Sequence, residues 1–141
     1  MDAENSGTDV GTSQLLEPVH RLMTKPVVFA DGEMTLRTLA ATMADEAVGA
    51  VVLLGPDGPS TIVTERDIVE ALADGADPDD TWAAEVASID LMAADPDDTV
   101  ADVARMMVTH NVRHVPVRAY GSVVGMVSAR DVLRVVDEAW S

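Results

Sequence analysis

An ungapped internal repeat with a spacing of 64 residues constrains the fold more than any other feature of this chain. Identical residues pair across the repeat at Ala30 and Ala94, Asp31 and Asp95, Thr35 and Thr99, Met43 and Met107, Val51 and Val115, Arg66 and Arg130, and Asp67 and Asp131. A unit of about 50 residues cannot bury one apolar sheet face alone. We therefore expect the two copies to pack on each other around a pseudo-twofold axis.

Each copy shows the same order of patterns. A short apolar stretch (27–29 or 91–93) is followed by Thr35 or Thr99, which can cap a helix with apolar residues at 3–4 spacing. Two apolar runs separated by turn residues then predict a hairpin, and a second helix follows from about residue 65 or 129. The sequence thus predicts an α/β (α+β) fold with a β-α-β-β-α unit that occurs twice.

The domain boundaries follow from composition. Residues 1–14 are polar and without apolar period, which indicates a disordered tail. We place the first repeat at 15–75 and the second at 76–141, and the turn-rich stretch 74–80 leads into a further helix that carries Trp82.

Charge and composition limit the compartment and the partners. The formal net charge is −16 and there is no cysteine. Such a charge repels phosphate backbones and anionic lipids, and no apolar run approaches the roughly 20 residues of a membrane span. We expect a cytoplasmic protein with neither a nucleic-acid nor a membrane partner. The acidity itself has a simple explanation in genome composition or a high-salt environment.

Two short motifs, Thr64 with Asp67 and Ser128 with Asp131, stand at the start of the second helix of each copy. The S/T-x-x-D spacing is typical of a capping box, in which hydroxyl and carboxylate satisfy backbone N–H groups. The same helix start also suits a nucleoside phosphate, because N–H groups attract phosphate and a carboxylate binds ribose hydroxyls. Both interpretations remain open at this stage.

The motifs "MTKPV" (23–27), "GAVVLLGPDG" (49–58), "IVTERD" (62–67), "VRHVPV" (112–117) and "VGMVSARD" (124–131) together resemble the tandem cystathionine-beta-synthase (CBS) domain pair, or Bateman module. The resemblance implies a non-catalytic regulatory module that binds AMP, ADP, ATP or S-adenosylmethionine in the cleft between the repeats. It also implies a homodimer and a downstream protein that responds to the ligand. No serine-histidine-acid arrangement or glycine-rich phosphate loop supports an enzyme.

The candidate ligand-binding residues are Lys25, Thr64, Arg66, Asp67, His114, Ser128, Arg130 and Asp131. The arginines and Lys25 can supply positive charge for a phosphate, although each arginine can equally pair with a surface acid. Gly125 fits the family pattern, whereas its counterpart Thr61 can crowd a ligand.

Two alternative functions stay open. The first is a constitutive interaction scaffold whose clefts are filled by its own side chains. The second is a metal-responsive module, since His110 and His114 stand four residues apart. We expect no metal there, because His114 falls where the chain turns into a strand.

Overall fold

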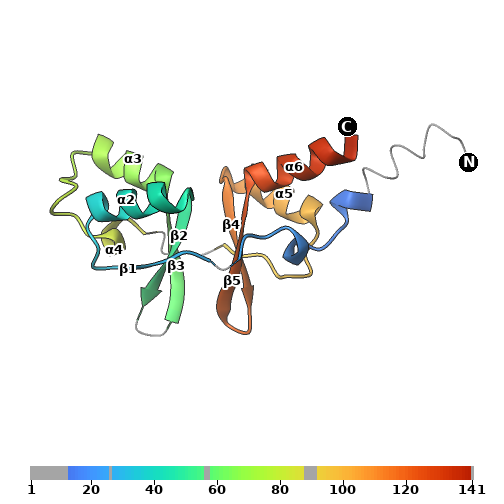
Figure 1. Cartoon of the computed structure of the whole chain (residues 1–141), viewed down its shortest axis with the longest axis horizontal. Helices are drawn as coiled ribbons and strands as arrows, with labels where there is room; N and C mark the ends of the chain where they lie inside the picture. Colours follow the sequence, from blue (N-terminus) through green and yellow to red (C-terminus); the bar gives the residue numbers. More distant parts are fainter. Residues whose placement is uncertain (1–12, 26, 56–57, 88–91, 141) are drawn as a thin grey trace, which may run out of the picture. The chain divides into compact units, whose positions relative to one another are not determined.

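The computed structural model describes residues 13–25, 27–55, 58–87 and 92–140, and its first repeat forms the predicted unit (Figure 1). In chain order the first repeat contains β1 (Phe29–Asp31), α2 (Leu36–Glu46), β2 (Ala50–Gly55), β3 (Gly58–Thr64) and α3 (Glu65–Ala73). The sheet order is β1-β2-β3, with β1 parallel and β3 antiparallel to β2. The β-α-β-β-α prediction is therefore confirmed for this repeat.

The second repeat has a shorter sheet than predicted. It contains α5 (Val100–His110), β4 (His114–Ala119), β5 (Ser122–Ser128) and α6 (Ala129–Trp140). The strand predicted at 91–93 is replaced by an isolated parallel bridge between Ala94 and Val117, and residue 91 lies outside the described residues. In the first repeat the Val52 N–H donates to the Val28 carbonyl at 3.0 Å, but the residue equivalent to Val52 is Pro116, which has no N–H.

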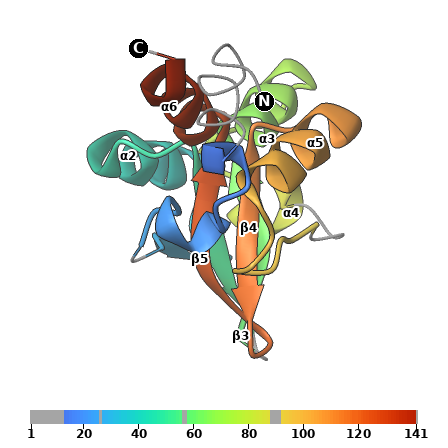
Figure 2. The ribbon, with the colours of Figure 1, turned by 90° about the vertical axis from the view of Figure 1, so that its right-hand side faces the viewer.

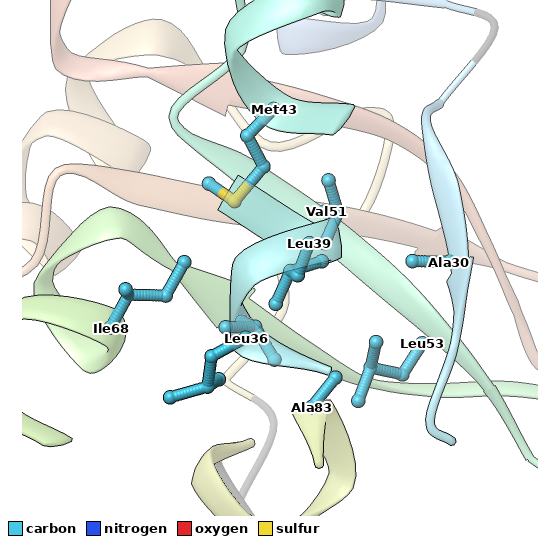
Figure 3. Packing of buried hydrophobic residues seen from close by; sticks show 9 residues of the cluster. Ala30, Leu36, Leu39, Met43, Val51, Leu53, Ile68 and Ala83 are labelled. Carbon is cyan, nitrogen blue, oxygen red and sulfur yellow. The ribbon is translucent and has the colours of Figure 1, made fainter. Parts of the chain in front are cut away.

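Both repeats bury the same set of positions. In the first, one cluster joins β1, α2, the sheet and α3, and most of its side chains are labelled in Figure 3. Its members are Ala30, Leu36, Leu39, Met43, Val51, Leu53, Val63, Ile68 and Ala83. The residues 64 positions away are also buried: Ala94, Val100, Val103, Met107, Val115, Val117, Val127, Val132 and, for Ala83, Val19. The repeat thus encodes one core design twice.

The segment that precedes each repeat packs on the other repeat. The chain forms two compact units: one contains 26–92 and 121–123, and the other contains 1–25, 93–120 and 124–141. In the second of these units, η1 (Val19–Arg21) joins the start of α5, where the Val19 N–H donates to the Asp98 carbonyl at 2.8 Å. Thr24 then pairs with Met126 of β5, and Figure 2 shows this blue segment beside β5.

The first unit repeats this joint with α4 (Ala83–Val86). The Ala83 N–H donates to the Met34 carbonyl at 2.7 Å, and the Leu36 N–H donates to the Thr81 carbonyl at 3.0 Å. Each partner lies 64 residues from its counterpart in the η1 joint, where the Val100 N–H donates to Glu17 at 3.0 Å. The predicted helix that carries Trp82 is α4, with Trp82 as its N-cap residue.

The predicted tail falls largely on residues that the structure does not describe. Of residues 1–14, only Ser13 and Gln14 are described, and both are helical. Within the described part of the chain, no helix combines the length and apolar character needed to cross a membrane.

Candidate functional site

The capping interpretation of Thr64 and Asp67 is confirmed by hydrogen bonds in both directions. The Asp67 N–H donates to Thr64 Oγ1 at 3.3 Å, and the Thr64 N–H donates to Asp67 Oδ2 at 2.8 Å. The Thr64 hydroxyl also lies 3.1 Å from the same Oδ2 atom. A reciprocal box of this kind stabilises a helix start by about 1 kcal/mol.

The second copy forms the same box with serine in place of threonine. The Asp131 N–H donates to Ser128 Oγ at 3.1 Å, and the Ser128 N–H donates to Asp131 Oδ2 at 2.8 Å. These bonds use one oxygen of the carboxylate. The other, Oδ1, lies 3.6 Å from a guanidinium nitrogen of Arg134.

A further bond joins the start of each second helix to the residue just before the first strand of the hairpin. The Glu65 N–H donates to the Gly49 carbonyl at 3.0 Å, and the Ala129 N–H donates to the Arg113 carbonyl at 2.7 Å. Two of the first three N–H groups of α6 therefore already have protein acceptors, in Arg113 and Ser128. The Arg130 N–H stands between them in the chain, in the first turn of a helix, where N–H groups generally favour an anion.

The two helix starts carry opposite charge. The first has Glu65, Arg66, Asp67 and Glu70, whereas the equivalent positions of the second hold Ala129, Arg130, Asp131 and Arg134. The first set carries three acids against one arginine, and the second carries one acid against two arginines. An anionic group is therefore favoured at the start of α6 over the start of α3.

The structure brings most of the predicted residues of the second copy into one unit. Lys25 is exposed and follows Thr24, whose N–H donates to the Met126 carbonyl on β5 at 2.8 Å. His114 is the first, half-buried residue of β4 and follows Arg113, which is bonded to the start of α6. Lys25 therefore follows a residue that pairs with β5, the strand that ends at Ser128, and His114 begins the strand that pairs with β5.

The remaining predicted cations, Arg66 and Arg130, are exposed at the second position of α3 and α6. Arg134 was missed by the sequence analysis. The signal for it was available, because residues three apart on a helix share a face and Arg134 stands three residues after Asp131.

The expected role of Gly125 needs correction. Gly125 is buried, and a Cβ built on it would lie 2.3 Å from Met23 Sδ and 2.7 Å from Met23 Cγ. The Met23 side chain therefore occupies the space beside this glycine. In the first repeat Thr61 takes the place of Gly125, and Ala87 takes the place of Met23. The larger side chain of the pair is therefore on the strand in the first repeat and on the leading segment in the second.

The histidines do not form a metal site within the described chain. His110 ends α5 and is exposed, whereas His114 starts β4. Over the ranges that the structure describes, no three histidine, cysteine, aspartate or glutamate side chains come together in a way that could hold a metal ion.

Comparison with known proteins identifies both repeats. The family model of the CBS domain matches residues 19–74 and 83–138, two segments with the same 64-residue offset. An uncharacterized protein of Methanocaldococcus jannaschii is 26% identical over 89% of this chain and 45% of its own length. Hypoxic response protein 1 of Mycobacterium tuberculosis is 33% identical over 74% of each chain. A protein of Methanopyrus kandleri is matched over 58% of its length, so the chain spans about half of the first two relatives.

Solved structures with the same fold include complexes with small molecules. A CBS domain protein from Pyrobaculum aerophilum, complexed with AMP, is 31% identical, with a TM-score of 0.74 over 86% of this chain and 98% of that one. The CBS domain pair of protein MJ0100, in complex with 5′-methylthioadenosine and S-adenosylmethionine, is 25% identical, with a TM-score of 0.78 over 87% and 98%. Hypoxic response protein I with two coordinated zinc ions is 30% identical, with a TM-score of 0.71 over 83% and 97%.

Proposed function

Because the chain belongs to the CBS-domain family and consists of two CBS domains in tandem, a regulatory module, we propose that it is a non-catalytic sensor of an adenosine-containing ligand. The ligand class is AMP, ADP, ATP or S-adenosylmethionine. The observation that carries this proposal is the pair of S/T-x-x-D boxes in a chain whose relative from Pyrobaculum aerophilum was crystallised with AMP.

The chemistry of each box suits a nucleoside phosphate. Each aspartate uses Oδ2 for the cap, and Oδ1 is the atom that would accept a hydrogen bond from a ribose hydroxyl. The hydroxyl of Thr64 or Ser128 can turn its hydrogen toward a phosphate oxygen while its lone pair still accepts from the helix. Cap and ligand site are therefore compatible in one motif.

Charge favours the second repeat as the nucleotide site. Arg134 lies 3.6 Å from Asp131, Arg130 is the residue before Asp131, and Lys25 and His114 belong to the same compact unit. The first repeat offers Arg66 beside Thr64 and Asp67, but it also places Glu65 and Glu70 at the helix start. A phosphate therefore meets repulsion at the first helix start and attraction at the second.

Thermal unfolding with AMP, ADP, ATP and S-adenosylmethionine tests the proposal. A ligand at ~100 times its dissociation constant should stabilise the protein by about 2.7 kcal/mol. Asp131→Asn keeps an oxygen for the cap but removes the negative charge, and it should abolish most of the ligand-induced shift. Asp67→Asn, the matched variant, should have a smaller effect. If none of the four compounds raises the unfolding temperature at millimolar concentration, the ligand assignment is wrong.

Charge exchange tests the choice of repeat. Arg134→Glu gives the second helix start the glutamate of the first, and it should weaken nucleotide binding at least threefold, as expected for one exposed charge pair. The reverse change, Glu70→Arg, should leave that binding constant unchanged if the nucleotide occupies the second repeat. Equal effects of both changes would contradict the assignment.

We propose a homodimer as the assembled form, because both repeats expose apolar residues on their second helices. Val69 and Leu72 of α3 are 63% and 45% exposed, and their counterparts Leu133 and Val136 of α6 are 65% and 37% exposed. A groove of about 490 Å³ is lined in part by Val69 and by Ala40 and Ala44 of α2. A second copy of the chain offers matching apolar helices.

The oligomeric state can be measured by sedimentation. Leu133→Glu should convert a dimer to a monomer, whereas Tyr120→Glu, at a fully exposed turn residue, should not. A wild-type chain that sediments as a monomer at 100 μM would refute the dimer.

The alternative is a constitutive interaction scaffold, and the Met23 side chain beside Gly125 favours it. In that case Asp131→Asn and Asp67→Asn would change stability by no more than a cap is worth, about 1 kcal/mol, and no adenosine compound would bind. Zinc is present in the structure of one relative, but the described residues here offer no cluster of ligands, and we assign none.

A further inference from the structure

Besides the groove at Val69, a second pocket lies in the unit that contains the first repeat. It is next to the end of β1, and neither Thr64 nor Asp67 lines it. It has a volume of about 560 Å³, within the range of ligand pockets. Its lining residues are Asp31, Gly32, Glu33, Leu54, Trp82, Ala84 and Glu85. None of the candidate nucleotide-binding residues is among them.

The pocket has an apolar interior and an acidic rim. Leu54 and Trp82 are 51% and 47% exposed, although both are large and apolar. A Cβ on Gly32 would lie 3.1 Å from Ala84 Cβ, so the glycine allows α4 to approach the end of β1. The pocket lining therefore combines two small residues, Gly32 and Ala84, with the partly exposed Trp82.

Hydrogen bonds from backbone N–H groups hold two of the three carboxylates, those of Asp31 and Glu85. The Trp82 N–H donates to Glu85 Oε2 at 2.7 Å, and the Glu33 N–H donates to Asp31 Oδ1 at 2.9 Å. Each bond uses one oxygen of its carboxylate, and both carboxylates line the same pocket as Trp82. Among the described residues that line the pocket there are three carboxylates and no basic side chain.

The second repeat shows what this geometry accommodates. The positions 64 residues away are Asp95 and Asp97 for the acids, Arg118 for Leu54, Pro18 for Trp82, His20 for Ala84 and Arg21 for Glu85. The same backbone joint therefore carries its own arginines in the second repeat and none in the first. Basic residues thus stand at these positions in the second repeat, where Arg21 pairs with Glu17, and the first repeat has none.

We propose that this pocket binds an arginine side chain from a partner protein. A guanidinium group stacks on an indole face through cation–π attraction, and its fork matches carboxylate oxygens. The apolar stem of the arginine would lie against Leu54. The occupant is thus a basic segment of the protein that responds to this module, and its binding site is separate from the proposed nucleotide site.

The test uses N-acetyl-arginine methylamide, in which the guanidinium is the sole charge, and the uncharged citrulline analogue as control. In nitrogen-15 spectra of the full chain, the Trp82 indole signal should shift saturably with the arginine compound, while the Trp140 signal stays in place. The citrulline compound should cause no shift. An unmoved Trp82 signal, or equal shifts with both compounds, would refute the proposal.

Matched variants separate a built pocket from diffuse attraction to an acidic surface. Glu33→Gln should weaken binding by up to about fivefold, the upper end of the range expected for one exposed charge pair. Asp97→Asn removes the same charge at the equivalent position of the second repeat and should leave binding unchanged. If both variants weaken binding equally, the attraction comes from net charge alone and the pocket is not the site.

Discussion

The contact between Met23 and Gly125 gives a sharp test of the structure. In Gly125→Ala the new Cβ would lie 2.3, 2.7 and 3.1 Å from Met23 Sδ, Cγ and Cβ, whereas carbon and sulfur atoms prefer separations of about 3.5–4.0 Å. The Met23 side chain must move by about 1 Å or more, because its middle atoms as well as its end are too close. We expect a loss of about 1–3 kcal/mol in the free energy of unfolding.

Met23→Ala removes the Sδ and Cγ atoms, which lie closest to the new Cβ at position 125. By itself this change should cost about 1–1.5 kcal/mol, because the methionine is half-buried. In the double variant the two closest contacts, with Met23 Sδ and Cγ, are gone and only the 3.1 Å contact with Cβ stays, so the two losses should not add, and the coupling energy should reach at least about 1 kcal/mol. Urea unfolding followed by circular dichroism measures all four proteins.

The first repeat supplies the matched control. Its equivalent pair is Ala87 and Thr61, with the bulk on the strand instead of the leading segment. Gly125→Thr combined with Met23→Ala copies that pair into the second repeat and should be more stable than Gly125→Thr alone. If the losses from Gly125→Ala and Met23→Ala add to within about 0.3 kcal/mol, Met23 does not pack on Gly125 and the reasoning fails.

Three further predictions concern stability. Ala47 follows α2 in the left-handed conformation, with φ 55°, and Asn111 takes the same place in the second repeat, with φ 53°. Ala47→Gly should therefore stabilise the protein by about 0.5–1 kcal/mol, and Asn111→Ala should destabilise it. Urea midpoints that move in the opposite directions would contradict this. Hydrogen bonds from the Thr99 N–H and its hydroxyl lower the pKa of Asp102, so its stabilising contribution is present above the unfolded value of about 3.9 and is lost as pH falls through the lower folded value. In Asp102→Asn the free energy of unfolding should accordingly fall less steeply as the pH is lowered below about 4. An unchanged dependence on pH would contradict the hydrogen bonds between Thr99 and Asp102. The exposed ion pair of Arg37 with Asp79 is screened by solvent, so Arg37→Ala should leave the unfolding temperature nearly unchanged, and a clear drop in a thermal melt would contradict this.

The local structure could be read from the sequence because its causes are local. Thr64 and Asp67 are three residues apart, and the box they form depends on this spacing alone. The core positions follow from apolar residues at helical or strand period, and the same pattern occurs in both repeats, 64 residues apart. The same offset predicted the fold class before any contact was known.

The candidate site was only partly predictable. The charge difference between the two helix starts is visible in Glu70 and Arg134, but it gains meaning only when α6 places Arg134 within 3.6 Å of Asp131. Gly125 looked like open space, because a sequence does not show which side chain will fill the room that a glycine leaves. Met23 is 102 residues away in the chain, and only tertiary packing brings it there.

The sequence by itself determined the two repeats, their helices and hairpins, their caps and their cores, since each depends on residues close in the chain. Tertiary structure decided which repeat each leading segment joins: residues 13–25 bond to the second repeat, and the segment with α4 bonds to the first. The two repeats present equivalent acceptors, such as the carbonyls of Met34 and Asp98, so local pattern cannot choose between them. That choice depends on chain connectivity and long-range packing, and it creates both the Met23 contact and the acidic pocket beside Trp82.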